Sequence, residues 1–128
     1  MTETPLRIVV ADDEDDVRLL LSLQLARHGC VIVGESIDGA GAAKLCQEQE
    51  VDAVVLDLLM PGVSGFEAIP RLREASPGVA IVAYTAVAGD FVRDEMARLD
   101  VPLVLKSGDS QVLYETLRRT VDTIRRRN

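Results

Sequence analysis

Short apolar runs alternate along the chain with longer segments in which apolar residues recur every three or four positions. The short runs are rich in Val, Ile and Leu and are bounded by acidic or turn-forming residues, which is typical of buried strands. They predict five β-strands, at Leu6–Ala11, Val31–Gly34, Asp52–Asp57, Val79–Thr85 and Leu103–Lys106.

The longer segments predict helices from Asp13 to about His28, Gly39 to Glu48, Ser64 to Glu74, Ala88 to Leu99, and Ser110, an N-cap candidate, to about Ile124. In the first of these, the helical spacing predicts an inward stripe of Val17, Leu20, Leu21 and Leu25. Leu19 and Leu23 fall off that stripe, so they are candidates for a contact with a partner.

Five strand–helix units predict a parallel sheet with helices on both faces, an α/β fold. Strands that are apolar throughout fit such a sheet, because both of its faces are buried. The 128 residues supply one core, so we expect residues 1–128 to form a single domain.

Composition and charge exclude several classes of function. The chain carries 21 Asp and Glu against 14 Lys and Arg, a formal charge of −7, which disfavours direct binding to nucleic acid or to anionic lipid. No apolar stretch approaches the ~20 residues that cross a bilayer, and the N-terminus does not resemble a signal peptide. Cys30 and Cys46 are too few for a disulfide scaffold. We therefore expect a cytoplasmic protein that does not bind a membrane.

Polar residues whose side chains can bind ions or take part in catalysis follow four of the five predicted strands. Asp12 and Asp13 follow the first, Asp57 ends the third, Thr85 ends the fourth and Lys106 ends the fifth. The carboxyl ends of parallel strands meet at one edge of the sheet, where ligands bind in open α/β folds. These side chains are therefore expected to form one site.

The residue types at this edge favour phosphoryl transfer with a divalent cation. Three carboxylates without a nearby His or Cys suit a hard ion, Mg²⁺ or alternatively Mn²⁺. Asp57 can attack phosphorus as a nucleophile. Lys106 and Thr85 can contact phosphoryl oxygens, and Ala86 is small enough to let the group approach. Together they would spread the charge of the transferred group.

The motifs VVADDEDD, VVLDLLMPGVSG, YTA and VLKS, in this order, resemble the receiver domain of two-component response regulators from about Leu6 to Ile124. The resemblance implies a flavodoxin-like three-layer fold with strand order 2-1-3-4-5, and phosphoryl transfer from a sensor histidine kinase or phosphotransfer protein onto Asp57. It also implies that Mg²⁺ is bound by Asp13, Asp57 and the backbone carbonyl of Leu59, with Asp12 acting mainly through water. Thr85 and Lys106 match the switch hydroxyl and the phosphate-pairing lysine.

Three positions depart from the family pattern. Leu103 stands where an aromatic residue is common, Leu99–Pro102 replaces a small glycine-containing turn, and Ser107 replaces a proline after the lysine. They bear on how phosphorylation is read out. Leu59 and Val87 stand where the family tunes hydrolysis, and as apolar residues neither can orient a water. We therefore predict a long-lived phosphorylated state.

The sequence is also compatible with several alternatives. The chain could be a degenerate receiver that acts as an unphosphorylated scaffold, although it retains the site residues. A phosphohydrolase would need an acid where Leu59 stands, so we expect no turnover enzyme. Phosphorylation-dependent dimerisation is a further hypothesis. The C-terminal arginines, Arg118, Arg119 and Arg125–Arg127, either complement a helix end or mark a junction to an output domain, which could bind DNA.

Overall fold

The computed structural model describes residues 4–60, 62, 64–86, 88–106 and 109–127. Five strands alternate with five helices: β1 Arg7–Ala11, α1 Asp15–Arg27, β2 Val31–Ser36, α2 Gly39–Glu48, β3 Ala53–Leu56, α3 Gly65–Ala75, β4 Ala80–Thr85, α4 Asp90–Arg98, β5 Leu103–Leu105 and α5 Ser110–Arg127. The strands form one parallel sheet in the order β2-β1-β3-β4-β5. The predicted fold class and strand order are confirmed.

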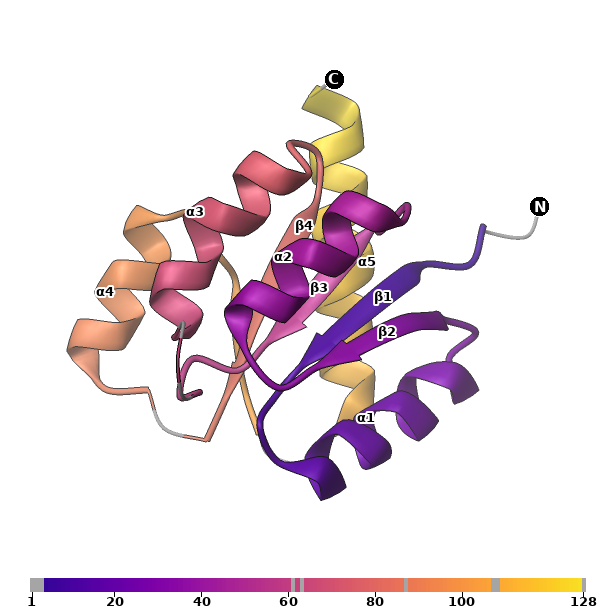
Figure 1. Ribbon diagram of the computed structural model, residues 1–128, viewed down its shortest axis with the longest axis horizontal. Helices are drawn as coiled ribbons and strands as arrows, with labels where there is room; N and C mark the ends of the chain where they lie inside the picture. The colour runs from indigo at the N-terminus through magenta and orange to yellow at the C-terminus, as the bar shows by residue number, and fades with distance from the viewer. Residues whose placement is uncertain (1–3, 61, 63, 87, 107–108, 128) are drawn as a thin grey trace.

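The sheet lies between two layers of helices, with α1 and α5 on one face and α2, α3 and α4 toward the other (Figure 1). Alternate residues of each strand enter different cores, as the strand period of two requires. Ile8 and Val10 pack with Leu25 and Leu117 on the first face. Val9 packs with Ile69 and Leu72 of α3 on the second face. Strands buried on both sides explain why the sequence shows apolar runs without alternation.

Two details of the helices differ from the sequence prediction. Leu20 is 55% exposed rather than inward, while Leu21 and Leu25 are buried as expected. The reason is that α1 lies toward the β2 edge of the sheet, which covers only a narrow stripe of the helix (Figure 1). At α5, the cap is supplied by Asp109, whose Oδ1 accepts from the Gln111 N–H at 2.9 Å, and Ser110 is the first helical residue.

Other boundaries move by a few residues. The strand predicted to end at Gly34 continues to Ser36, and the last helix continues to Arg127. Leu19 and Leu23 are exposed, at 60% and 55%. Among the described residues no helix combines the length and apolar character needed to span a membrane.

Candidate functional site

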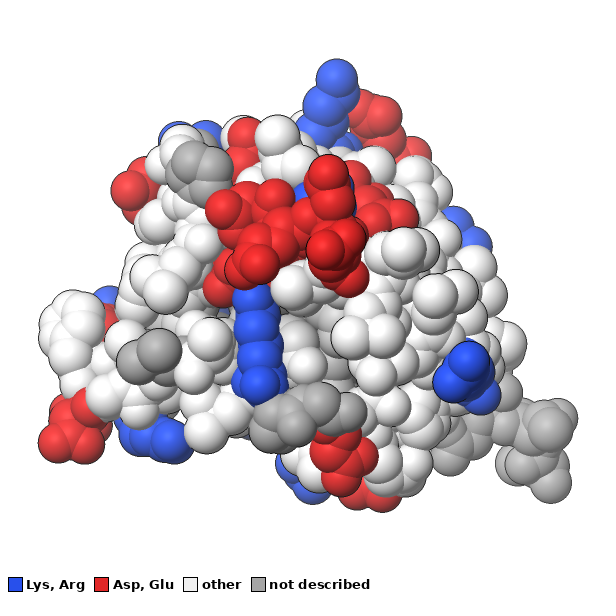
Figure 2. All heavy atoms as spheres, turned by 90° about the horizontal axis from the view of Figure 1, so that it is seen from below, with Lys and Arg blue, Asp and Glu red and all other residues white. Residues whose placement is uncertain are grey.

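The polar residues predicted at the strand ends lie at one edge of the sheet. Asp12 directly follows β1, Asp57 follows β3, Thr85 ends β4 and Lys106 follows β5. Asp12, Asp57 and Thr85 are buried, with only 1%, 4% and 1% of their surface exposed. Seen from this end, Asp and Glu side chains form a patch that a basic side chain borders (Figure 2).

Backbone hydrogen bonds between adjacent strand ends hold these residues in register. They run from Asp12 N to Ser36 O at 3.0 Å, from Asp57 N to Ala11 O at 2.9 Å, and from Lys106 N to Thr85 O at 2.8 Å. The side chains therefore start from fixed positions on the sheet rather than from free loops, which is what a pre-organised site needs.

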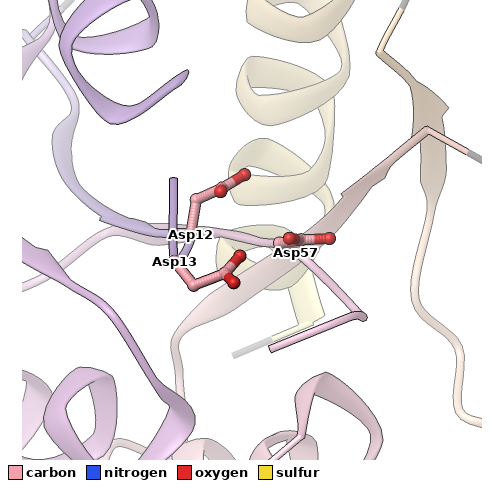
Figure 3. Close-up of side chains that lie close together, drawn as sticks. All are labelled: Asp12, Asp13 and Asp57. Carbon is pink, nitrogen blue, oxygen red and sulfur yellow. The ribbon is translucent and has the colours of Figure 1, made fainter. Parts of the chain in front are cut away.

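Three carboxylates gather at the centre of the site. One ligand oxygen each from Asp12, Asp13 and Asp57 lies within 4.8 Å of the other two (Figure 3). Backbone amides orient the two buried groups: Asp12 Oδ1 accepts from Glu14 N at 2.9 Å and Asp57 Oδ1 from Leu59 N at 3.2 Å. Asp13 is exposed, so the cluster opens to solvent on its side.

Lys106 contributes the ammonium of the site. Its Nζ donates to Asp12 Oδ2 at 2.7 Å and lies 3.5 Å from Asp57 Oδ2. Burial alone would lower the pKa of Lys106, but the hydrogen bond to Asp12 and the charges of Asp57 and Asp12 outweigh burial and raise it. The lysine is therefore held in its charged form.

Burial dominates the electrostatics of Asp57. Desolvation raises the pKa of its carboxyl above the ordinary 3.8, against the opposing effects of the Leu59 amide and Lys106, and the nearby charge of Asp12 raises it further. Keeping this carboxylate ionised in a buried position therefore costs free energy, which a bound cation would offset.

The donor set fits a divalent cation. All donors are carboxylate oxygens, the kind that Mg²⁺ prefers. Three carboxylates face one ammonium among the described groups, which leaves a surplus of two negative charges (3 − 1 = 2). The backbone carbonyl of Leu59 stays a predicted ligand, and its side chain is 65% exposed.

Two further residues that the sequence singled out, Ala86 and Leu103, lie directly after β4 and at the first position of β5. Ala86, next to Thr85, is exposed, and Leu103 is half-buried at the start of β5. Val87 and Ser107 lie outside the described residues. Thr85 thus ends β4 at the same edge of the sheet as the carboxylates, and the exposed Ala86 follows it.

The family model of the response regulator receiver domain matches residues 8–118, nearly all of the sheet and the whole acidic edge. The chain belongs to the response regulator receiver domain family.

Several named response regulators are similar to this receiver domain. The nitrate/nitrite response regulator protein NarP of Escherichia coli (strain K12) is 33% identical over 122 residues, 90% of this chain and 54% of that protein. The transcriptional regulatory protein AfsQ1 of Streptomyces coelicolor is 33% identical over 116 residues, 90% of this chain and 47% of that protein. The chain therefore spans about half the length of these relatives.

Solved structures support the same fold. A LuxR-family two-component response regulator from Aurantimonas sp. SI85-9A1 matches with a TM-score of 0.86 at 27% sequence identity. The matched region is 94% of this chain and 87% of that structure's chain. A CheY-like response regulator receiver domain protein from Methanospirillum hungatei JF-1 matches with a TM-score of 0.86 over 98% of this chain and 100% of that structure's chain. At 14% sequence identity, this match supports the fold and nothing further.

Two residues next to the site, Arg18 and Gly65, could not be found from the strand ends alone. Arg18, in the first half of α1, donates from Nη1 to the backbone carbonyl of Asp12 at 2.7 Å. It also pairs with Asp15 and, at 3.5 Å, with Glu35. Arg18 thus ties the β1–α1 turn of the receiver domain to α1 and β2. In the sequence, the only indication of this role is that Arg18 follows the acidic residues Asp15 and Asp16 at the start of the predicted helix.

Gly65 is the second such residue. A Cβ built on it would lie 2.5 Å from Asp57 O and 2.5 Å from Leu58 Cα, both backbone atoms that cannot move aside easily. The start of α3 therefore packs directly against the chain that carries Asp57. The Ser64–Gly65 pair in the sequence indicated that a helix begins here, and Ser64 does cap α3 by accepting from Glu67 N at 3.3 Å.

Proposed function

We propose that this receiver domain accepts a phosphoryl group on Asp57 from a sensor histidine kinase or phosphotransfer protein, with Mg²⁺ as cofactor. The observation that carries the proposal is the setting of Asp57. Its carboxylate is buried, is oriented by the Leu59 amide, lies 3.5 Å from Lys106 and shares the carboxylate cluster with Asp12 and Asp13.

In the proposed step, a carboxylate oxygen of Asp57 attacks phosphorus of a phosphohistidine. A P–O bond forms as the P–N bond breaks, and the imidazole leaves with the electron pair of the broken bond. Lys106 and Thr85 stabilise the charge on the phosphoryl oxygens. Asp12, Asp13, Asp57 and the Leu59 carbonyl would hold Mg²⁺, which supplies a further positive charge when bound.

The phosphorylated state would act as a switch rather than as an enzyme with a turnover substrate. A phosphoryl group on Asp57 attracts Lys106 and Thr85, and this contact biases the loop after β4 and the surface of α4, β5 and α5. The outputs we propose are control of a partner or output domain, or self-association, in the cytoplasm. With a charge of −7, the domain itself would not bind nucleic acid or a membrane surface.

The scaffold alternative is less well supported. A protein that is never phosphorylated has no use for two buried carboxylates beside an exposed third, because their repulsion destabilises the fold. Here Asp12 and Asp57 remain buried, and in the part of the chain that the structure describes Lys106 supplies the one ammonium near them.

Electrophoresis in a phosphate-retarding gel, after incubation with acetyl phosphate and Mg²⁺, tests the proposal. The wild type should give a shifted band that Asp57→Asn and EDTA abolish. Asp16→Asn is the matched control, because Asp16 lies in the same acidic run but is exposed. It should keep the shift. A folded wild type without a shifted band, with either acetyl phosphate or a phosphorylated histidine phosphotransfer protein as donor, would overturn the proposal.

A further inference from the structure

A cavity of about 530 Å³ lies at the end of the sheet opposite the acidic edge. Its floor is formed by Val79, just before β4, and Ile81 near the start of β4, whereas Thr85 of the acidic edge ends the same strand. Its walls are the C-terminal half of α5, the end of α3 with the loop after it, and the turn between α4 and β5. The volume falls in the range of roughly 300–1,000 Å³ that is usual for small-molecule sites.

Pro102 explains why the cavity exists. β4 has six residues, but β5 has only three and pairs with Ala83, Tyr84 and Thr85. The Pro102 carbonyl accepts from Ala83 N at 2.9 Å. In the same register the carbonyl of Ile81 would need an N–H from Pro102, which proline lacks. The strand therefore cannot continue, and the edge of β4 beside Ile81 stays uncovered by β5.

The α5 wall presents a regular polar stripe to the cavity. Arg119, Thr123 and Arg127 line it at spacings of four residues, so they lie on one helical face. The two arginines are eight residues apart, about 12 Å along the helix axis. Among the described residues neither the Arg119 guanidinium nor the Thr123 hydroxyl has a hydrogen-bond or ion-pair partner. Ile124 supplies apolar surface beside them.

The opposite wall adds a third guanidinium and one carboxylate. Arg73 Nη2 donates to the backbone carbonyl of Asp100 at 3.2 Å, and Arg127 Nη1 lies 3.3 Å from Asp100 Oδ2. The side chains of Arg127 and Asp100 are 64% and 77% exposed, so this ion pair is weak and an incoming anion can replace it. Three guanidinium groups against one carboxylate leave two positive charges in excess, in a chain of charge −7.

We propose that this cavity binds a small organic anion, a carboxylate or phosphate carried on an apolar or aromatic body. The planar forks of Arg119 and its neighbours would hold the anionic group by paired hydrogen bonds. The body would lie against the apolar side chains of the lining, Val79, Ile81 and Ile124. The proposal is independent of phosphorylation, because no residue of the cavity belongs to the acidic edge.

Nuclear magnetic resonance titration of the 128-residue chain in EDTA tests the proposal. Phenyl phosphate and benzoate represent the two anionic groups on an aromatic body, while inorganic phosphate and benzyl alcohol represent the separate halves. We expect saturable amide shifts confined to the cavity lining with phenyl phosphate or benzoate, and the stronger of the two identifies the anionic group. Each separate half should bind at least about ten-fold more weakly, because it makes only part of the contacts.

Three variants locate the binding. Arg119→Gln removes a guanidinium and should weaken binding about five-fold or more. Thr123→Phe fills the cavity and should abolish saturable shifts. Arg126→Gln is the control, because Arg126 is exposed on the same helix and does not line this cavity. It should bind as the wild type does.

Several results would overturn the proposal. One is the absence of saturation by either aromatic anion in a folded protein. Another is an equal effect of Arg119→Gln and Arg126→Gln, which would indicate general attraction to basic side chains. Concentration-dependent broadening of the same amides without ligand would show that a second copy covers this surface instead.

Discussion

The ammonium of Lys106 lies 2.7 Å from a carboxylate oxygen of Asp12 but 3.5 Å from Asp57, so its nearer partner is not the proposed phosphoacceptor. The two carboxylates share one cation, and the lysine binds the deeper of them. A phosphoryl group on Asp57 would bring new anionic oxygens toward the same ammonium. The lysine would then exchange one partner for the other, which links the charge on Asp57 to the position of Lys106.

Lys106→Met should destabilise the protein by about 3 kcal/mol at pH 7, because it removes the ammonium that the two buried carboxylates of Asp12 and Asp57 share. Urea unfolding at pH 7 and at pH 4 measures the effect. The loss should be smaller at pH 4, because burial raises the pKa of Asp57 and this carboxylate is then more often protonated. Lys44→Met is the control, since Lys44 is 77% exposed and forms only a 3.9 Å pair with Glu48. Equal stability of the Lys106→Met variant and the wild type at pH 7 would contradict the prediction.

Asp57→Asn should stabilise the protein at pH 7 in EDTA. Because burial raises the pKa of Asp57 in the folded state, its contribution to stability is greatest below the unfolded value of about 3.8 and is lost as pH rises through the raised folded value. The advantage of the variant should therefore fade toward acidic pH. Added Mg²⁺ should raise the melting temperature of the wild type and leave that of the variant nearly unchanged. Thermal unfolding followed by circular dichroism measures the effect of the substitution and the effect of Mg²⁺. A wild-type melting temperature that does not change with Mg²⁺ would refute the prediction that Asp57 helps to bind the metal.

Gly65→Ala should destabilise the protein by about 1–3 kcal/mol, because the new Cβ would meet the backbone of Asp57 and Leu58 at 2.5 Å. It should also slow phosphorylation by acetyl phosphate, since relief of the clash displaces the chain that carries Asp57. Gly78→Ala is the matched control, as no atom lies within 4 Å of a Cβ at that position. Denaturant unfolding and the rate of band shift test the pair. Similar effects of both substitutions would rule out the close approach as the cause.

Cys46 should make the protein less stable as pH rises above 9. Burial raises the pKa of its thiol from 9.0 to about 11, so between these values the unfolded state loses a proton that the folded state retains. The wild type should therefore lose more stability between pH 8.5 and pH 10.5 than Cys46→Ala does. Urea unfolding at the two pH values gives this difference, and parallel losses would disprove the assignment. The folded protein should also react slowly with thiol reagents at pH 8.

The phosphorylated state should last for minutes or longer in the presence of Mg²⁺. The side chain of Leu59 is exposed beside the site but has no group that could orient an attacking water. Leu59→Asn supplies such a group and should shorten the lifetime. The decay of the retarded band after removal of acetyl phosphate measures it. Loss of the band within seconds in the wild type would exclude a slow intrinsic hydrolysis.

The strand ends were predictable from the sequence because parallel strands bring their carboxyl ends together whatever the loops do. This is why Asp57 and Lys106, 49 positions apart (106 − 57 = 49), could be assigned to one site. Helix faces were less predictable. Leu20 and Leu21 both fit a helical stripe, and only the position of α1 beside the sheet decides that Leu21 is the buried one.

Contacts between residues far apart in the sequence could not be predicted from the spacing of apolar residues. The side chains of Arg73 and Arg127 approach Asp100 from α3 and α5, elements that nothing in their local sequence places together. Arg18 donates to a backbone carbonyl, and the position of that carbonyl depends on the path of the turn after β1. Such features depend on distances in the folded chain, which composition and spacing do not contain.

The three-residue length of β5 also bears on how copies of the protein meet when it is concentrated. Exposed sheet edges can add strands from other molecules and so begin aggregation. On the β5 side Pro102 interrupts the edge, and the guanidinium groups of Arg73 and Arg119 would repel the same surface of another copy. The opposite edge, β2, is six residues long and exposes Val31. Intermolecular sheet growth would therefore begin at β2.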